Sequence, residues 1–289
     1  MKKYRYIFIL IAAAVFAGCT VKKDKEYGQV DESGYTLIQA DIESLLFGTD
    51  QRVWPQGAAI GVYGSEMGEN EPFVIKTAGE GLKTAGFYGP MVKGEVAAYF
   101  PYSESYVADA SAMPYTLQTQ QAYHSDPVEM FLKYTPMAFA GMEGGKLKFA
   151  YPNALLKVTV ESQSDITVRQ VKLTSTDSKL SGLGVFLSDG SVSMTESSQN
   201  YVELDCGEGL PAVASDGTHN GFYMVVAPGT YDDLELQVSL DGAEAPFACR
   251  IPEVTLKKIS ATDFCMVTVG FRPVGGPAGF DEIEVEFDE

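Results

Sequence analysis

The sequence Leu-Lys-Val-Thr-Val-Glu occupies positions 156–161, and Val-Arg-Gln-Val-Lys-Leu follows at positions 168–173. In both stretches apolar and polar residues largely alternate, so a β-strand would turn one face to a core and the other to water. A helix would instead need apolar residues three and four positions apart, and that periodicity is almost absent from this chain. The two stretches therefore predict strands, and they favour an all-β fold.

Short runs of the same kind recur along the chain, rich in valine, phenylalanine or tyrosine and bounded by glycine, proline, asparagine or aspartate. Such punctuation is typical of strands joined by turns. Residues 35–47 fit a helix or a strand, and the strand propensity of the first residues favours a strand. The other predicted strands are 59–63, 73–77, 95–100, 146–150, 155–162, 167–175, 201–205, 221–227, 234–240, 247–251 and 264–271.

Three glycines at positions 141, 144 and 145 separate two apolar runs and mark the best domain boundary. They divide the chain into an N-terminal unit, 35–144, and a C-terminal unit, 145–289. Each unit contains several short strands with turns about ten residues apart, which is typical of an antiparallel β-sandwich. We therefore expect two such domains in tandem.

The N-terminus has the pattern of a secretory signal. Lys2, Lys3 and Arg5 precede an apolar stretch, 7–16, that is too short to span a membrane, and no later apolar stretch approaches eighteen residues. Residues 1–18 are therefore predicted to be a signal peptide.

Val-Phe-Ala-Gly-Cys-Thr at positions 15–20 resembles the lipobox of bacterial lipoproteins. The resemblance implies cleavage between Gly18 and Cys19 and attachment of diacylglycerol to the Cys19 thiol. A plain signal peptide with an incidental cysteine is the alternative. Residues 19–34 are charged and have little to bury, so we expect a lipidated tether. Within it, the charged run 22–26 resembles a surface-export signal of Bacteroidetes lipoproteins, or simply keeps the tether solvated.

Without residues 1–18 the chain has 39 acidic and 18 basic residues, a net charge of −21. Such a surface repels nucleic acid and anionic lipid, which excludes both as expected partners. Attachment to the outer membrane would therefore depend on the acyl chains at Cys19.

Recognisable catalytic and metal-binding patterns are missing. The two histidines, His124 and His219, have no metal-ligand spacing, and there is neither a Cys-x-x-Cys pair nor a Gly-x-Ser-x-Gly motif. Gly-Gly-Lys at 144–146 fails as a phosphate loop because Ala140 and Leu147 replace the required glycine and hydroxyl residue. Counting alone leaves open a pair of glycosidase carboxylates, although an acidic surface scatters such residues everywhere. We expect no enzyme activity, no cofactor and no metal site.

Cys206, Cys249 and Cys265 remain after lipidation, an odd number for an exported chain. A Cys249–Cys265 bridge between neighbouring strands is one alternative. The other is that both are packed thiols, because apolar residues surround them in the sequence.

Several segments resemble, in order, landmarks of the fimbrillin family of Bacteroidales lipoproteins. They are Arg-Val-Trp-Pro-Gln-Gly-Ala-Ala-Ile-Gly-Val-Tyr at 52–63, Val-Ala-Ala-Tyr-Phe-Pro-Tyr-Ser at 96–103, the stretch 147–160, Lys-Leu-Ser-Gly at 179–182, and Met-Val-Val-Ala-Pro-Gly-Thr-Tyr at 224–231. Ala58 departs from the usual aspartate, and Tyr151-Pro152 from a common Phe-x-His pattern. The resemblance implies two transthyretin-like β-sandwich domains and a structural or tip subunit of an adhesive cell-surface fimbria. Its implied partners are other fimbrial subunits and a host protein or glycan.

The resemblance also implies an assembly mechanism. A surface protease would cut after Arg52, the first strand, 35–47, would leave, and a strand of another subunit would take its place by β-augmentation. The alternative is that Arg52 is an ordinary surface arginine and the chain stays uncut.

The C-terminal residues 280–289 follow a glycine-rich break and suit the role of the incoming strand. Ile283, Val285 and Phe287 alternate with acidic residues and would share one face. The strand could equally fold back as the last edge of its own domain.

A surface glycan-binding lipoprotein of a nutrient-uptake system is the alternative function, with Trp54 as a candidate sugar platform. The aromatic residues would in that case lie exposed.

Overall fold

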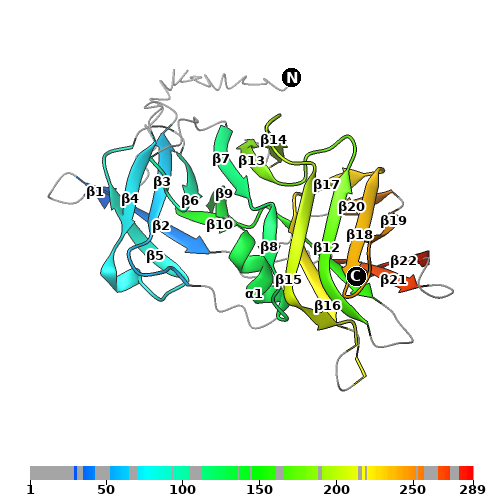
Figure 1. Cartoon of the computed structure of the whole chain (residues 1–289). Helices are drawn as coiled ribbons and strands as arrows, with labels where there is room; N and C mark the ends of the chain where they lie inside the picture. Colours follow the sequence, from blue (N-terminus) through cyan, green and yellow to red (C-terminus); the bar gives the residue numbers. More distant parts are fainter. Residues whose placement is uncertain are drawn as a thin grey trace, which may run out of the picture.

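The structure is a computed structural model. It describes residues 29–30, 35–42, 53–64, 70–92, 94, 96–104, 112–135, 137–143, 145–160, 166–187, 191–213, 217–218, 220–251, 253–256, 266–273 and 280–288 (Figure 1). The predicted signal peptide, Cys19 and Arg52 lie outside these residues.

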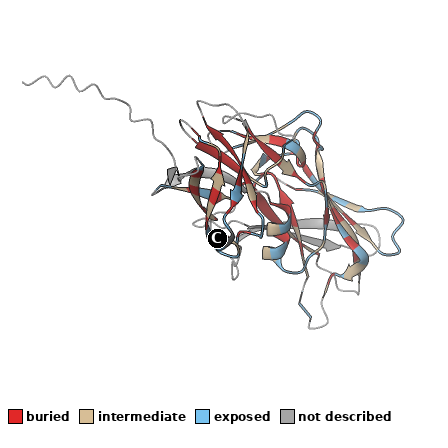
Figure 2. Cartoon of the chain, turned by 90° about the vertical axis from the view of Figure 1, so that its left-hand side faces the viewer, coloured by how far each residue is buried: buried red, intermediate tan, exposed pale blue. Residues whose placement is uncertain are grey.

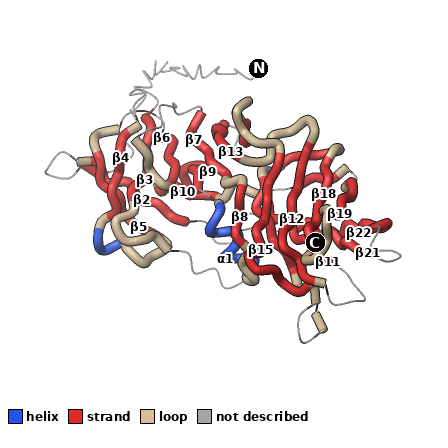
Figure 3. Tube along the Cα trace, viewed as in Figure 1, coloured by secondary structure: helices blue, strands red, loops and turns tan. Residues whose placement is uncertain are grey.

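The described residues are mostly strand, as the sequence predicts, and they gather into several sheets (Figure 3). Residues 29–100 form most of one end of the molecule, and residues from 154 onward form most of the other (Figure 1). The first sheet contains β1 (Gln29–Val30), β2 (Thr36–Ile42), β3 (Ala59–Gly64), β4 (Glu71–Ile75), β5 (Thr84–Gly89), β6 (Val96–Phe100), β9 (Met137–Glu143) and β10 (Lys146–Ala150), with the 3-10 helix η1 (Thr77–Gly79) before β5.

The first sheet closes on itself through β2. Its strand order is β1-β2-β10-β9-β6-β3-β4-β5, and β2 also pairs with β5. Closing a sheet in this way removes the open edges that would otherwise expose unpaired backbone groups.

Two larger sheets form the other end of the molecule, and buried residues from both belong to one hydrophobic cluster. Figure 2 colours the ribbon by the burial of each residue. The first of these sheets, in order, is β16 (Gly221–Val226), β11 (Ala154–Val160), β21 (Met266–Pro273) and β22 (Phe280–Asp288). The second is β19 (Phe247–Arg250), β18 (Leu234–Leu240), β12 (Thr167–Ser175), β15 (Tyr201–Pro211) and β8 (Gln120–Ala122). There are also two small sheets among the described residues. One has the order β14 (Val192–Met194), β13 (Gly182–Leu187) and β7 (Ala112–Leu117), and the other pairs β17 (Gly229–Tyr231) with β20 (Val254–Leu256).

The strand 168–173, which helped to decide the fold class, shows the expected alternation. In β12, Val168, Val171 and Leu173 are fully buried, whereas Gln170 and Lys172 are only partly so. Both pairings of β12 shift register between Val168 and Gln170, and against β18 this shift places one extra residue in β12.

Strand pairing does not follow the predicted boundary between residues 144 and 145. β10 lies after that boundary but pairs with β9 and β2 of the first sheet. β7 and β8 lie before it but pair with β13 and β15. The chain therefore passes from the first end to the second and back before it enters β11, and the division into units 35–144 and 145–289 stays a prediction.

We expected antiparallel pairing throughout, but the structure also contains parallel pairs. β2 with β10, β11 with β21, and β8 with β15 are parallel pairs. Parallel neighbours need a long connection between them. Local alternation cannot reveal such a connection, because it predicts a strand but not its partner.

The helix α1 (Pro127–Tyr134) is absent from our predictions. Asp126 caps it by accepting hydrogen bonds from the backbone N–H groups of Val128, at 2.7 Å, and Glu129, at 3.2 Å. Proline directly after a capping aspartate is a helix-start signal. A helix of eight residues is too short for its periodicity to stand out from the neighbouring strands.

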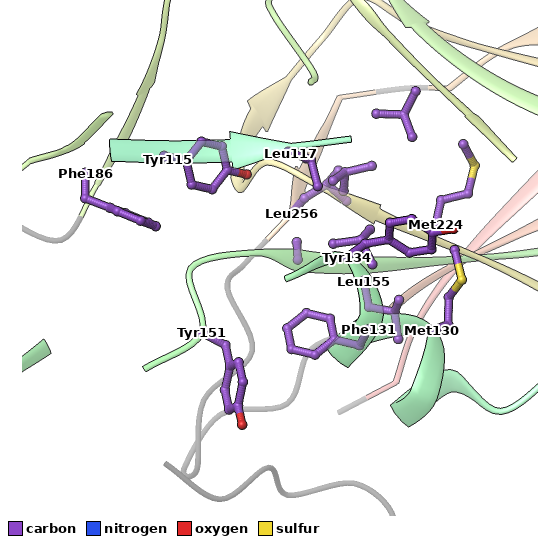
Figure 4. Packing of buried hydrophobic residues seen from close by; sticks show 14 of the residues in the cluster. Tyr115, Leu117, Met130, Phe131, Tyr134, Tyr151, Leu155, Phe186, Met224 and Leu256 are labelled. Carbon is purple, nitrogen blue, oxygen red and sulfur yellow. The ribbon is translucent and has the colours of Figure 1, made fainter. Parts of the chain in front are cut away.

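The helix contributes Met130, Phe131 and Tyr134 to the hydrophobic core, where they lie close to Leu155 and Met224 (Figure 4). Phe131 and Met130 are fully buried, and the Phe131 ring lies 5.7 Å from the Tyr151 ring. The Tyr134 hydroxyl accepts a 2.6 Å hydrogen bond from the Ala122 N–H at the end of β8. These contacts hold the returning chain against β8, so the crossing segment is part of the core.

Gln121 on β8 protects the outer edge of β16. Its Nε2 donates to the Val225 carbonyl at 2.7 Å, and its Oε1 accepts from the Val225 N–H at 2.9 Å. The side chain thus satisfies both backbone groups of one residue, as a neighbouring strand would. Because Gln121 is 1% exposed, water cannot take over these bonds.

The first prediction concerns this amide. Gln121→Leu leaves the Val225 N–H and carbonyl buried without partners, so we expect the free energy of unfolding to fall by about 3 kcal/mol and Tm by about 6–12 °C. Gln120→Leu, at an exposed position of the same strand, is the matched control and should change Tm little. Equal effects of the two substitutions in thermal unfolding would contradict the role of Gln121.

Candidate assembly site at the first strand

The candidate site is the seam that β2 closes in the first sheet. Along one edge, residues 36–41 of β2 pair antiparallel with residues 84–89 of β5. Along the other edge, residues 36–37 pair with β1 and residues 40–42 pair parallel with residues 147–149 of β10. Both backbone edges of β2 are therefore occupied, and β5 and β10 each depend on it for part of their pairing.

The side chains of β2 alternate between core and outer face. Ile38, Ala40 and Ile42 are 3%, 0% and 4% exposed, whereas Leu37 and Gln39 are only partly buried. The prediction of a strand within 35–47, which was close between helix and strand, is confirmed for residues 36–42. A helix would have scattered these three side chains around its axis, so burial of every second residue explains the outcome.

Trp54 lies directly beneath the seam. It is fully buried, and its ring meets those of Phe87, Phe100 and Phe149 edge-on, with centroids 4.8, 5.4 and 5.2 Å away. Its Nε1 donates a 3.3 Å hydrogen bond to the Ala40 carbonyl of β2. The indole thus joins the first strand to the core, and a buried indole of this kind offers no platform to a sugar.

Two polar atoms of β2 are held imperfectly. Among the described residues, Thr36 Oγ1 and Asp41 Oδ1 are buried and have no hydrogen-bond partner. The other Asp41 oxygen, Oδ2, lies 3.5 Å from Lys146 Nζ on β10. A buried polar atom without a hydrogen-bond partner lowers the free energy of unfolding. The closed sheet is therefore less stable than it would be with these two atoms satisfied.

Val53 is 39% exposed, whereas the next residue, Trp54, is fully buried. The Trp54 N–H donates to the Leu82 carbonyl and the Gly81 N–H to the Trp54 carbonyl, both at 2.9 Å. These two bonds fix the Trp54 backbone to the turn before β5. Arg52, the predicted cleavage residue, precedes Val53 outside the described residues, as do Gly18 and Cys19.

The predicted donor strand is observed as β22. It pairs antiparallel with β21, and Ile283, Val285 and Phe287 lie opposite Phe271, Val269 and Val267. β22 is the last strand in the order of its sheet, so in this structure the C-terminal strand pairs within its own chain. Of our two alternatives, this is the arrangement of the isolated subunit, and donation to another subunit stays a proposal.

The sequence analysis singled out Trp54 and the first strand, 35–47. It did not identify Thr36, Asp41 or Lys146 as residues of this site. A signal for Lys146 existed, because Lys-Leu-Lys-Phe at 146–149 alternates and would place lysines on the outer face. Its proximity to Asp41 could not be foreseen, since the two residues are about a hundred positions apart.

No group of three or more histidine, cysteine, aspartate or glutamate side chains that could hold a metal ion occurs in the described residues. The same part of the chain contains no helix long and apolar enough to cross a bilayer.

Cys206 is a buried free thiol and Cys249 is a partly buried one, so the packed-thiol alternative holds for Cys249. Burial is the main cause that raises the pKa of each to about 12, with smaller contributions from Asp205 and Glu235. Cys265 lies outside the described residues.

No family model matches the chain, and no curated protein sequence does. Solved structures do match it. A fimbrial protein from Bacteroides vulgatus is 14% identical, with a TM-score of 0.50 over 87% of this chain and 98% of that chain. A candidate cell adhesion protein from Bacteroides uniformis is 14% identical, with a TM-score of 0.50 over 89% and 98%. The tip fimbrial protein Mfa3 from Porphyromonas gingivalis is 14% identical, with a TM-score of 0.43 over 88% and 98%.

The first two matches define the class of fold. Most of this chain has the architecture of fimbrial and candidate cell adhesion proteins of Bacteroidales, which agrees with the resemblance seen in the sequence motifs. At this level of identity the matches show the fold alone.

The second prediction concerns the buried hydroxyl of Thr36. Thr36→Val replaces it with a methyl group of the same shape, so we expect the free energy of unfolding to rise by about 1 kcal/mol. Thr36→Ser keeps a hydroxyl and removes a methyl, and should lower it by about 1 kcal/mol. Thr84→Val, exposed on the neighbouring strand β5, is the control and should have little effect in urea unfolding. Destabilisation by Thr36→Val would contradict the absence of a partner.

The third prediction concerns the two thiols. With a pKa of about 12, fewer than about one in 10⁴ molecules carries a thiolate at neutral pH. Cys206 and Cys249 should therefore resist iodoacetamide in the native protein and react fully in guanidinium chloride, as mapped by peptide mass spectrometry. Rapid native labelling of either residue would contradict the described burial.

Proposed function

We propose that this chain is a non-enzymatic structural or tip subunit of a cell-surface fimbria, assembled from a lipoprotein precursor by strand exchange after proteolysis. The observation that carries the proposal is the placement of β2. Among the described strands only the two-residue β1 precedes it, it pairs along both of its edges, and a predicted cleavage residue lies between it and Trp54. One cut after Arg52 would leave β2 held only by non-covalent contacts.

The fold supports this proposal, since the proteins with matching architecture are described as fimbrial or candidate cell adhesion proteins. The lipobox adds the expected route, with cleavage before Cys19, an outer-membrane anchor, and exposure at the cell surface. We infer that the two ends of the molecule correspond to two transthyretin-like domains. Its partners would be other subunits and, through the finished fibre, a host protein or glycan.

Loss of β2 would create the acceptor surface. Residues 84–89 of β5 and 147–149 of β10 would each lose the backbone partners on one edge, and the space filled by Ile38, Ala40 and Ile42 would open above Trp54. Unpaired strand edges beside an apolar groove bind an added strand. In the proposed fibre the strand comes from residues 280–289 of a second subunit, with Ile283, Val285 and Phe287 turned inward.

The energy of that joint can be estimated. Three apolar side chains contribute about 1.5–3 kcal/mol each, and about six backbone hydrogen bonds contribute about 1 kcal/mol each. The total is on the order of 10 kcal/mol before ordering costs, which suits a durable contact between subunits.

The fourth prediction tests processing directly. Mass spectrometry of the protein taken from its native cell surface should find an N-terminus at Val53 in the polymeric fraction and a lipidated Cys19 in the precursor. Arg52→Gln should leave only the lipidated form and abolish the polymer, because β2 then stays attached to the chain.

Arg169→Gln changes a partly exposed arginine that pairs with Asp241 at the other end of the molecule and is the control for charge, so it should leave processing unchanged. A polymer whose subunits all begin at Cys19 would contradict strand removal. A chain that enters no polymer at all would contradict the proposed function.

A further inference from the structure

The outer rim of the seam is positively charged along β10. Lys146 and Lys148 occupy its outward positions, while Leu147 and Phe149 between and beyond them are fully buried. In the register of the parallel pair, Lys148 lies opposite Asp41 and Leu147 opposite Ala40, so the same register continued by one residue sets Lys146 beside Gln39. The Lys146 ammonium also reaches the Asp41 carboxylate, at 3.5 Å.

The opposite rim, on β5, has a different character. Thr84, Gly86 and Tyr88 lie opposite Asp41, Gln39 and Leu37. Gly86 has no side chain, and a Cβ there would stand 2.9 Å from a Leu37 methyl carbon. Lys76 Nζ lies 4.6 Å from the centre of the Tyr88 ring and adds further positive charge to this face. The only carboxylate that β2 itself offers to these lysines is Asp41.

The C-terminal strand, 280–289, contains more carboxylates than β2. Its even-numbered positions 282, 284, 286 and 288 are all glutamate or aspartate. Any placement that turns Ile283, Val285 and Phe287 toward the core turns these carboxylates outward, in either strand direction, because side chains alternate with a period of two. A register that places Ile283, Val285 and Phe287 at the buried positions 38, 40 and 42 therefore sets Glu284 and Glu286 at the positions now held by Gln39 and Asp41.

We propose that Lys146 and Lys148 are specificity-determining residues of the seam, which select an incoming strand that is apolar on its inner face and acidic on its outer face, namely residues 280–289 of a second copy of this chain. This inference rests on the proposed function and adds the rule by which the seam distinguishes among strands. The incoming strand presents a carboxylate to each lysine, whereas β2 presents one carboxylate and the neutral Gln39. The charge difference thus favours replacement of β2 and disfavours strands with a neutral or basic outer face.

The fifth prediction tests this rule with the full chain, nicked between β2 and Trp54 by an arginine-specific protease. Two synthetic peptides compete for the seam. One has the sequence of residues 280–289, and in the other Glu282, Glu284, Glu286 and Asp288 are replaced by their amides. Binding is followed by the emission of Trp54, the single tryptophan of the chain, and by release of the β2 fragment in mass spectrometry.

We expect the acidic peptide to bind about tenfold more tightly than the amide peptide at about 0.05 M salt, and about twofold more tightly at about 0.5 M salt, since salt screens partly exposed charges. Lys146→Gln should reduce the tenfold preference to about threefold. Lys146→Glu should reverse it, and a peptide with lysine at the matching outer position should restore tight binding. Lys179→Gln, an exposed lysine far from the seam, is the control and should keep the preference.

The outcomes distinguish the charge rule from the proposed strand exchange. Equal binding of both peptides by the nicked chain would overturn the charge rule while leaving strand exchange in place. Failure of both peptides to displace β2 would overturn the proposed function and this inference with it. Circular dichroism of the Lys146 variants before nicking establishes that they fold, and Lys148→Gln provides a second variant with the same expected direction.

Discussion

A strand at the edge of a sheet leaves one row of backbone N–H and carbonyl groups without ladder partners. In this chain β2 removes two such edges at once, because it pairs with β5 on one side and with β1 and β10 on the other. The core beneath it depends on the same strand, since Trp54 is packed by three aromatic rings and donates its hydrogen bond to the Ala40 carbonyl. The same strand therefore closes the sheet and completes the packing of the core.

That dependence gives the N-terminus two roles that conflict. The strand must close the sheet so that the subunit folds, and in the proposed assembly it must later leave. The imperfect satisfaction of Thr36 and Asp41 suits both roles, because it lowers the stability of the closed state without opening it. The position of β2 near the predicted lipidated tether means that removal of the strand would also remove the membrane anchor.

The other end of the molecule manages its edges differently. Gln121 satisfies the exposed backbone groups of Val225 with a side-chain amide, so β16 needs no further strand there. β22, at the opposite end of the same sheet, pairs with one described strand, β21, and carries the alternating acidic and apolar sequence.

The sequence by itself determined the strand content, because alternation at stretches such as 168–173 and the glycine and proline punctuation are local signals. It also favoured a strand over a helix, narrowly, within 35–47, where the structure has β2, and it predicted an alternation of acidic and apolar residues along 282–288. Only the tertiary structure decided that β10 joins the first sheet across the predicted boundary, that β7 and β8 join the second end, and that Lys146 meets Asp41. The physical reason is that a strand's partner depends on long connections and on which edges stay open when the chain returns, and no local pattern of residues records either.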